Sequence, residues 1–222
     1  MTLYHGSEEI VYHPVYGKGK SSNDFGRGFY CTEYPELAGE WACKRDRDGF
    51  INAYCFDTEG LNILKLNDGT HHILHWLALL CCYRGYWQKR SIAEEAKSYL
   101  QERFLPDISE ADVIIGYRAD DSYFSFAQDF IMGTISLQKL SEAMRLGSLG
   151  EQIVLKSEAA FGRISYLSCE AAEAAIYFAK KKQRDLDARR EYSAKRSKEA
   201  MLDEIYMIDI MRGRVSDDEL FL

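Results

Sequence analysis

Two glycines and a tyrosine in the segment 23–32 are the first candidates for chemistry. The segment reads Asn-Asp-Phe-Gly-Arg-Gly-Phe-Tyr-Cys-Thr, so Gly26 and Gly28 come just before Tyr30. Glycine permits positive φ angles and lets a ligand approach the main chain closely. A tyrosine ring directly after such a turn can lie against a bound ligand. The same pattern is typical of the entry to a strand with aromatic core residues, and both interpretations stay open here.

Two further polar residues stand at the ends of short predicted strands. His5 closes the segment Leu-Tyr-His-Gly-Ser near the N-terminus, and Glu151 opens the run Glu-Gln-Ile-Val-Leu. Each has a structural alternative, because a histidine at a strand end can be held by local hydrogen bonds and a glutamate there can be solvated. Together with Tyr30 they give a histidine, a tyrosine and a glutamate at three strand ends, which is a candidate site.

Hydrophobic periodicity and turn residues predict the elements that must position this site. Strands are expected at 2–5, 50–57, 61–66, 111–116, 151–156 and 164–168, and helices at 33–46, 70–86, 91–104, 122–134, 136–146, 157–163 and 170–202. Thr32 is expected to cap the first helix. The segment 8–22 carries glycines and lysines and is expected to form a mobile loop over the site. The mixture predicts an α+β protein.

The composition is that of a globular protein outside the membrane. The 222 residues are 46% hydrophobic and 28% charged, and they contain no run of about 18 apolar residues and no secretory signal. The six cysteines show no framework spacing and are expected to be reduced thiols, mostly in the core. These features predict a cytoplasmic protein with no membrane partner.

The charge is unevenly distributed along the chain. The formal net charge is −7, but residues 180–198 hold nine Lys or Arg against three Asp or Glu. The whole chain is therefore not expected to be a nucleic-acid binder. A basic helix at 170–202 could contact RNA, an acidic partner or the acidic body of the protein itself, or it could simply be solvated.

The three strand-end motifs together resemble a known superfamily. Residues 3–7 resemble the strand-ending His-Gly-Ser of the diphtheria-toxin-type ADP-ribosyltransferases, and Gly26-Arg27-Gly28-Phe29-Tyr30 resembles their Gly-x-Gly-x-Tyr turn. Residues 151–155 resemble the strand that opens with their catalytic glutamate. The chain as a whole is similar to the bacterial family catalogued as domain of unknown function 3990, through Asp-Phe-Gly-x-Gly-Phe-Tyr-x-Thr at 24–32 and Asp-Val-Ile-Ile-Gly at 112–116.

The resemblance implies NAD as substrate and a role for each site residue. Glu151 would stabilise the positive charge that develops on the ribose as the bond to nicotinamide breaks, and His5 would hold the adenosine-side ribose. Tyr30 and Trp41 would stack on the nicotinamide ring. The remaining implied NAD contacts are Gly6, Ser7, Gly28 and Arg27. No metal is implied.

The resemblance also implies the fold and the activity. It predicts an ADP-ribosyltransferase-like split β-sheet core with surrounding helices over residues 1–168, and a helical C-terminal extension over 169–222 that is packed on this core or projects from it. The implied activity is mono-ADP-ribosyl transfer from NAD to a protein or nucleic-acid acceptor, as the toxin of a toxin–antitoxin or phage-defence pair with an antitoxin protein as partner. An NAD glycohydrolase and a non-catalytic NAD- or ADP-ribose-binding module remain alternatives.

The sequence departs from the superfamily pattern in two places. Gln152 follows Glu151, and because side chains alternate along a strand only one of the two can face the site. The segment 8–22 has no arginine for the NAD diphosphate, so Lys18, Lys20 or Arg27 would have to serve.

Three histidines at 71, 72 and 75 raise the question of a metal. A zinc-protease helix needs a glutamate directly after its first histidine, and His72 stands in that place after His71. No metal site is therefore predicted.

Overall fold

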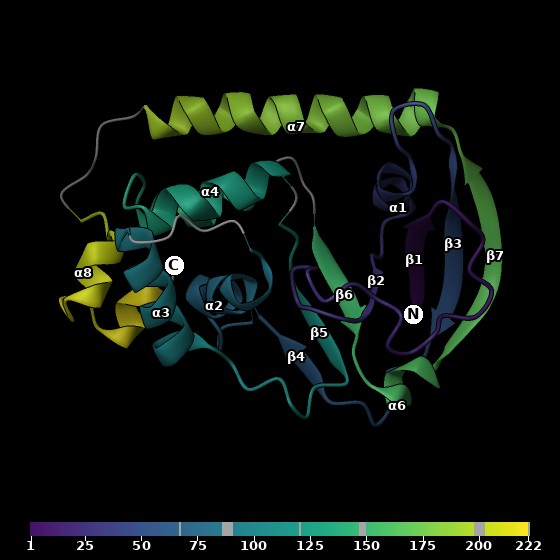
Figure 1. Cartoon of the computed structure of the whole chain (residues 1–222), viewed down its shortest axis with the longest axis horizontal. Helices are drawn as coiled ribbons and strands as arrows, with labels where there is room; N and C mark the ends of the chain where they lie inside the picture. Colours follow the sequence, from purple (N-terminus) through teal and green to yellow (C-terminus); the bar gives the residue numbers. More distant parts are fainter. Residues whose placement is uncertain (67, 86–90, 120, 147–149, 198–202, 222) are drawn as a thin grey trace.

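The computed structural model describes residues 1–66, 68–85, 91–119, 121–146, 150–197 and 203–221. The chain forms a mixed α+β fold with two sheets, as the sequence predicts (Figure 1). The elements in chain order are β1 (Thr2–Ser7), β2 (Phe29–Cys31), α1 (Pro35–Ala42), β3 (Gly49–Phe56), β4 (Ile63–Lys65), α2 (Ile73–Tyr83), α3 (Ile92–Phe104), β5 (Val113–Tyr117), α4 (Asp121–Ile131), α5 (Leu137–Ala143), β6 (Glu151–Leu155), α6 (Glu158–Phe161), β7 (Ile164–Ala172), α7 (Ala174–Arg196), α8 (Met207–Met211) and a 3₁₀ turn, η2 (Asp217–Leu220).

The first sheet is antiparallel and has the order β1-β3-β7. Helix α1 packs directly on β1 and β3 because glycines face it from both strands. A Cβ at Gly6 would stand 1.8 Å from the carbonyl oxygen of Ala38, and a Cβ at Gly49 would stand 2.5 Å from that of Ala42. Any larger residue at these positions would push the helix away from the sheet.

The second sheet has the order β2-β6-β5-β4, with β4 parallel to β5 and the other pairs antiparallel. Figure 1 shows β2 between β1 and β6, where the two sheets come together. Tyr4 and Thr32 exchange backbone hydrogen bonds of 2.8 and 2.9 Å at this junction. The segment that follows β2 is thereby fixed against β1, and residues from both sheets lie close together.

The largest hydrophobic core lies between the second sheet and the helices α2 to α5 and α8. Helix α2 is the centre of this core, as expected from its continuous apolar sequence. Trp76 on α2 is fully buried, and its indole N–H donates a 2.8 Å hydrogen bond to the carbonyl of Tyr117 at the end of β5. This bond ties the core helix to the strand end that borders the site described below.

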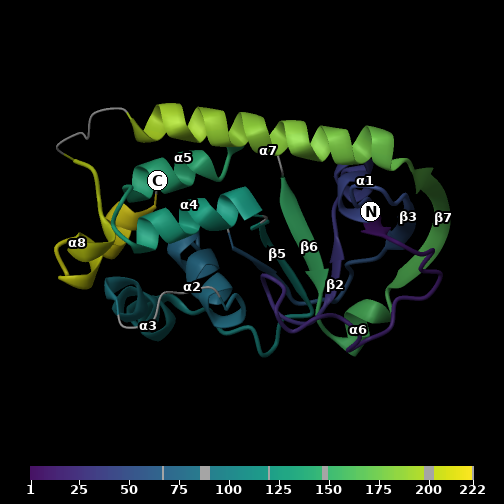
Figure 2. The ribbon, with the colours of Figure 1, turned by 45° about the horizontal axis from the view of Figure 1, so that its top comes forward.

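Helix α7 runs along one side of the molecule past both halves of the fold (Figures 1 and 2). At its start, Lys180 pairs with Glu36 and Arg184 pairs with Glu40, both on α1. Toward its end, Lys195 pairs with Glu142 on α5, and Arg196 pairs with Asp129 on α4. The basic helix therefore contacts the acidic body of the protein itself, which is one of the alternatives the sequence leaves open.

Several boundaries differ from the prediction. Thr32 does not cap α1, which begins three residues later with Tyr34 at the N-cap position, because the Thr32 backbone is used in the bridge to Tyr4. Residue 168, the expected end of the first part of the chain, lies inside β7, and α7 packs on the rest of the fold, which is one of the two placements left open for the C-terminal extension. Helix α8 was not predicted. The C-terminal ends of the predicted helices 70–86 and 170–202, at residue 86 and at residues 198–202, lie outside the described residues.

Among the described residues, no helix has both the length and the apolar character needed to cross a membrane. All six cysteines are free thiols. Cys31, Cys43 and Cys81 are buried, so half of the six cysteines, and not most of them as expected, lie in the core.

His72 has a structural role that makes stability depend on pH. Its Nδ1 accepts a 3.3 Å hydrogen bond from the backbone N–H of Leu74 and so caps α2. Burial is the main cause that lowers the pKa of His72 to about 4, from 6.5 when unfolded. The folded state then binds fewer protons than the unfolded state between these values, so stability is lost as the pH falls from 6.5 toward 4.

Replacing His72 by asparagine tests this role, because asparagine also caps helices but does not titrate. Urea unfolding at pH 7 and at pH 4.5 should show a smaller loss of stability on acidification in His72→Asn than in the wild type. Identical losses in the two proteins would show that His72 is not the titrating group.

Candidate functional site

A pocket of about 890 Å³ opens between the two sheets and α7. Its size lies within the range of about 300–1,000 Å³ that is typical of cofactor and ligand pockets. It is lined by His5, Gly6, Val11, His13, Pro14, Val15, Lys18, Gly19, Asn23, Asp24, Gly28, Phe29, Tyr30, Trp41, Arg84, Arg118, Ala119, Gln152, Phe178, Lys181, Lys182, Asp185, Leu186 and Arg189. Segments from almost the whole chain therefore meet at one cavity.

His5 enters the pocket from β1 as a neutral imidazole. Its Nδ1 lies 2.7 Å from the carbonyl oxygen of Tyr30, and because a carbonyl can only accept, Nδ1 must carry the hydrogen. Burial lowers the pKa of His5, which keeps the ring uncharged near neutral pH. The ring packs on Phe29, with centroids 4.3 Å apart. Nε2 is consequently the ring nitrogen that can accept a hydrogen bond from a ligand.

Tyr30 lines the pocket with a ring that is fixed through its hydroxyl. The hydroxyl donates a 2.7 Å hydrogen bond to the carbonyl of Gly26 and accepts one of 3.0 Å from the N–H of Phe25. Burial raises the pKa of Tyr30, so the phenol stays protonated. Because the hydroxyl is engaged by the preceding turn, the ring rather than the hydroxyl is what Tyr30 can offer to a ligand.

The backbone conformation and the packing of this turn explain why glycine stands at positions 26 and 28. Gly26 has a φ of 72°, which other residues rarely adopt. A Cβ at Gly28 would stand 2.5 Å from Cγ1 of Val154 and 2.8 Å from the carbonyl oxygen of Leu155, both on β6. The structural interpretation of the glycine pattern therefore holds here, while Gly28 also lines the pocket.

Trp41 reaches the pocket from α1 with an unused donor. Its indole nitrogen is buried and has no hydrogen-bond partner among the described residues. Such groups are rare in folded proteins because an unpaired buried donor costs free energy. The guanidinium carbon of Arg118 lies 4.5 Å from the centre of the Trp41 ring, a cation–π contact. A bound ligand that accepts from the indole would satisfy this donor.

Gln152, and not Glu151, faces the pocket from the start of β6. Gln152 is 3% exposed and lines the cavity, whereas Glu151 is exposed and lies outside the lining. The Gln152 side chain donates from Nε2 to Asp24 Oδ2 and to the carbonyl of Tyr117, each at 3.1 Å. Both bonds need the amide nitrogen, which fixes the orientation of the group. The oxygen Oε1 is left as the acceptor for a ligand.

Asp24 is a site residue that the sequence analysis missed. Its Oδ2 accepts a 2.9 Å hydrogen bond from the N–H of Ala119, and its Oδ1 lies 3.3 Å from Nε of Arg84. Burial raises the pKa of Asp24, against the opposing effects of these partners. The available signal was its position two residues before Gly26 of the glycine turn, but an aspartate before a turn is common on protein surfaces as well.

Besides Glu151, two residues assigned to the site by resemblance, Ser7 and Arg27, lie outside the pocket lining. Ser7 Oγ accepts a 2.9 Å hydrogen bond from Asn52 and donates one of 2.7 Å to the carbonyl of Glu9, so it fixes the local loop. Arg27 is exposed. Asn52 also accepts from the N–H of Val11, which anchors the start of the segment 8–22 beside the cavity.

The cations of the pocket come mostly from places the sequence did not indicate. Of the three bases proposed for a diphosphate, Lys18 lines the cavity, and Lys20 and Arg27 do not. The other lining cations are Arg84, Arg118, Lys181, Lys182 and Arg189. For the described part of the chain, no group of three or more His, Cys, Asp or Glu side chains is arranged to hold a metal ion.

Comparison with known proteins identifies the family. No curated protein and no solved structure matches the chain. Residues 1–166 match the family described as "Protein of unknown function (DUF3990)". This match covers three quarters of the sequence, including β1, the glycine turn and β6. The chain therefore belongs to the DUF3990 family.

Proposed function

We propose that the pocket binds NAD and that the protein transfers ADP-ribose from NAD to a macromolecular acceptor with release of nicotinamide. The observation that carries this proposal is that His5, Tyr30 and Trp41, from three separate elements, line one cavity. The cavity lies between two sheets, which is compatible with the split-sheet core of ADP-ribosyltransferases that the sequence motifs resemble. Helices α1 and α7, from the two halves of the chain, contribute to its lining.

The backbone of Gly6 is suitably directed for the nicotinamide amide. Main-chain N–H and C=O groups alternate sides along a strand, and those of Tyr4 bond to Thr32, away from β3. Two residues later, the groups of Gly6 point to the same side as those of Tyr4, and Gly6 lines the pocket. They can therefore bond a carboxamide that enters between Tyr30 and Trp41.

Two aromatic rings are available to contact such a group. Tyr30 and Trp41 both line the pocket. A nicotinamide ring between them would gain stacking contacts, and its amide would be near the unpaired indole N–H. His5 would accept from a ribose hydroxyl through Nε2.

The proposed reaction breaks the bond between C1′ of the ribose and the nicotinamide nitrogen. The bonding electron pair leaves with nicotinamide, positive charge develops on the ribose, and a nucleophile of the acceptor bonds to C1′ and loses its proton. Gln152 Oε1 would hold a ribose hydroxyl, and the carboxylate of Asp24 beside it would supply negative charge near the reacting carbon. Glu151 would reach this position only if the start of β6 turned over.

The start of strand β6 favours a second candidate function, non-catalytic binding of NAD or ADP-ribose. An amide at position 152 carries no negative charge, and the carboxylate of Glu151 lies outside the pocket lining. A non-catalytic module that binds NAD or ADP-ribose would need only the contacts described here. An NAD glycohydrolase, with water as the acceptor, would share all the groups of the transferase.

The test is release of free nicotinamide from NAD by the purified protein, with and without cell lysate as a source of acceptor. Release that needs lysate and labels a macromolecule supports the transferase, and release without lysate indicates a glycohydrolase. Binding of NAD or ADP-ribose without release would establish the binding module. If the protein neither releases nicotinamide nor binds NAD or ADP-ribose, NAD is refuted as the ligand.

The biological setting is a separate part of this proposal and rests on the family resemblance alone. As the toxin of a toxin–antitoxin or phage-defence pair, the protein would inhibit growth when expressed without its antitoxin. Induced expression in a bacterial host should then slow growth, and a variant that fails to release nicotinamide should not. Normal growth with an active, well-expressed protein would contradict the toxin assignment.

A further inference from the structure

We propose that helix α7 supplies the diphosphate-binding subsite of the pocket, through Lys181 and Lys182 together with Lys18 and Arg118. The identity of the natural ligand rests on the proposed function above, but the subsite itself is defined by the cavity and by charge. Neither of the two α7 lysines lies within residues 1–166, which match the family. The part of the subsite that α7 supplies thus lies outside the segment that matches the family.

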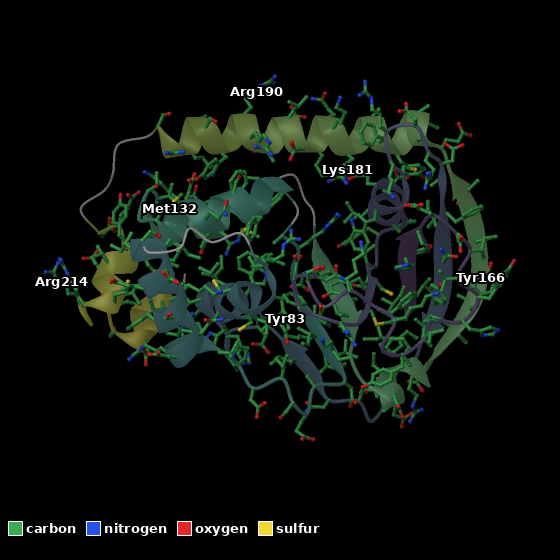
Figure 3. All side chains as sticks on the ribbon, viewed as in Figure 1. Tyr83, Met132, Tyr166, Lys181, Arg190 and Arg214 are labelled. Carbon is green, nitrogen blue, oxygen red and sulfur yellow. The ribbon has the colours of Figure 1, made fainter. Side chains whose placement is uncertain are left out.

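One face of α7 is turned toward the cavity. Phe178, Lys181, Lys182, Asp185 and Arg189 all line the pocket, and they recur at the three- and four-residue spacing of a helix face. Figure 3 shows Lys181 on the side of α7 that faces the body of the protein and Arg190 on the opposite side. The exposed fractions agree, since Lys181 is partly buried and the Arg190 side chain is 82% exposed.

Ion pairs on both sides of the cavity hold this face in place. Arg184 makes a bidentate contact with Glu40, with its Nη2 2.7 Å and its Nε 3.1 Å from the two carboxylate oxygens. Glu40 is only 1% exposed, which makes this pair much less screened than a surface pair. Near the other end, Lys195 lies 2.6 Å from Glu142. Lys181 and Lys182 lie within one turn of the Arg184 anchor and are therefore presented to the cavity by a fixed helix.

The pocket has an excess of positive charge in a protein that is negative overall. Its lining contains six Lys or Arg side chains and two acidic ones, whereas the whole chain carries a net charge of −7. Asp24 is paired with Arg84, and Asp185 with Arg189. The lining therefore holds four more basic than acidic side chains, and Lys18, Lys181 and Lys182 contribute to this excess. A ligand with two negative charges would offset part of it.

A diphosphate fits this arrangement better than a single carboxylate or an uncharged nucleoside. Lysine ammonium groups are compact charges that bind phosphate oxygens, and Arg118 adds planar donors beside the Trp41 ring. In the proposed binding mode the nicotinamide end lies near Tyr30 and Trp41. The diphosphate, which joins the two ribosides, would then lie along α7, and the lysines would select dinucleotides and ADP-ribose over nucleosides.

The experiment compares binding of ADP-ribose, inorganic pyrophosphate and adenosine by calorimetry to the wild type, Lys181→Met, Lys182→Met and Arg190→Met. Methionine keeps much of the apolar stem and removes the charge, and Arg190 is the matched control on the outer face of the same helix. We expect each lysine variant to raise the Kd for ADP-ribose and for pyrophosphate about tenfold. Adenosine binding should stay unchanged in the lysine variants, and all three ligands should bind Arg190→Met as they bind the wild type.

Equal Kd values for ADP-ribose in Lys181→Met, Lys182→Met and Arg190→Met would overturn the proposal. Loss of adenosine binding in parallel with ADP-ribose would overturn it as well, because that result indicates a general structural effect. Wild type that binds an RNA oligonucleotide but neither pyrophosphate nor ADP-ribose would assign the lysines to a nucleic-acid partner instead. Lysine-dependent pyrophosphate binding without nicotinamide release would support the subsite and refute only the catalytic function.

Discussion

Replacing Gln152 by alanine is expected to reduce nicotinamide release by about 100- to 1,000-fold, the usual cost of removing one preorganised polar contact to a transition state. The amide is held by Asp24 and by the carbonyl of Tyr117, so that Oε1 is directed to the ligand. Alanine removes this acceptor and leaves Asp24 with one fewer donor. Initial rates at saturating NAD, followed by separation of nicotinamide from NAD, measure the effect.

The matched control is Glu151→Ala, one residue away on the opposite face of β6. Because Glu151 is exposed and outside the pocket lining, its loss should change the rate by no more than about twofold, as expected of a surface substitution. The opposite pattern, with release lost in Glu151→Ala and kept in Gln152→Ala, would show that the start of β6 turns over on binding NAD. It would then assign the catalytic role to Glu151, as the family resemblance implies.

Gly6→Ala is expected to destabilise the fold by about 3 kcal/mol or more, at the upper end of the usual cost of overpacking. The new Cβ would stand 1.8 Å from the carbonyl oxygen of Ala38 and 2.8 Å from the backbone nitrogen of Ala42. Both atoms belong to the α1 backbone, so no side chain can rotate away and the helix itself must shift. Urea unfolding, with the midpoint converted to a free energy, measures the loss.

Gly85→Ala is the control for this substitution. Among the described residues, a Cβ at Gly85 would meet no atom within 4 Å, and the φ of Gly85 is not in the left-handed region. Its effect should stay within about 0.5 kcal/mol. Equal unfolding midpoints for the two variants would mean that α1 can move off β1 at little cost. Since α1 also carries Trp41, loss of NAD binding in Gly6→Ala would not by itself demonstrate a contact between Gly6 and the ligand.

The sequence alone predicted the order and type of most elements, because side-chain periodicity is a local property. The strand ending at Ser7, the core helix α2 and the strand β5 all follow from short apolar patterns and turn residues. Local signals brought His5, Gly28 and Tyr30 forward as site candidates, the family resemblance added Gly6 and Trp41, and all five line the pocket. Residues adjacent to strand ends and turns are the ones that local signals can place.

Local signals were insufficient where an environment is shared by distant segments. Alternation along β6 requires that only one of Glu151 and Gln152 faces the cavity, but the choice depends on how β6 lies between β2 and β5. Asp24 becomes a site residue only because Ala119, Arg84 and Gln152 converge on it from elsewhere in the chain.

Helix α7 shows most clearly the difference between what the sequence predicts and what only the tertiary structure decides. Its sequence determined a long basic helix, yet the same charges are compatible with a solvated face, a nucleic-acid contact or an internal contact. Only the tertiary structure, through Glu36 and Glu40 on one side of the cavity and Glu142 on the other, decided that Lys181 and Lys182 face the pocket. Periodicity fixes which residues share a helix face, but the partners of that face are set by packing between segments that are far apart in sequence.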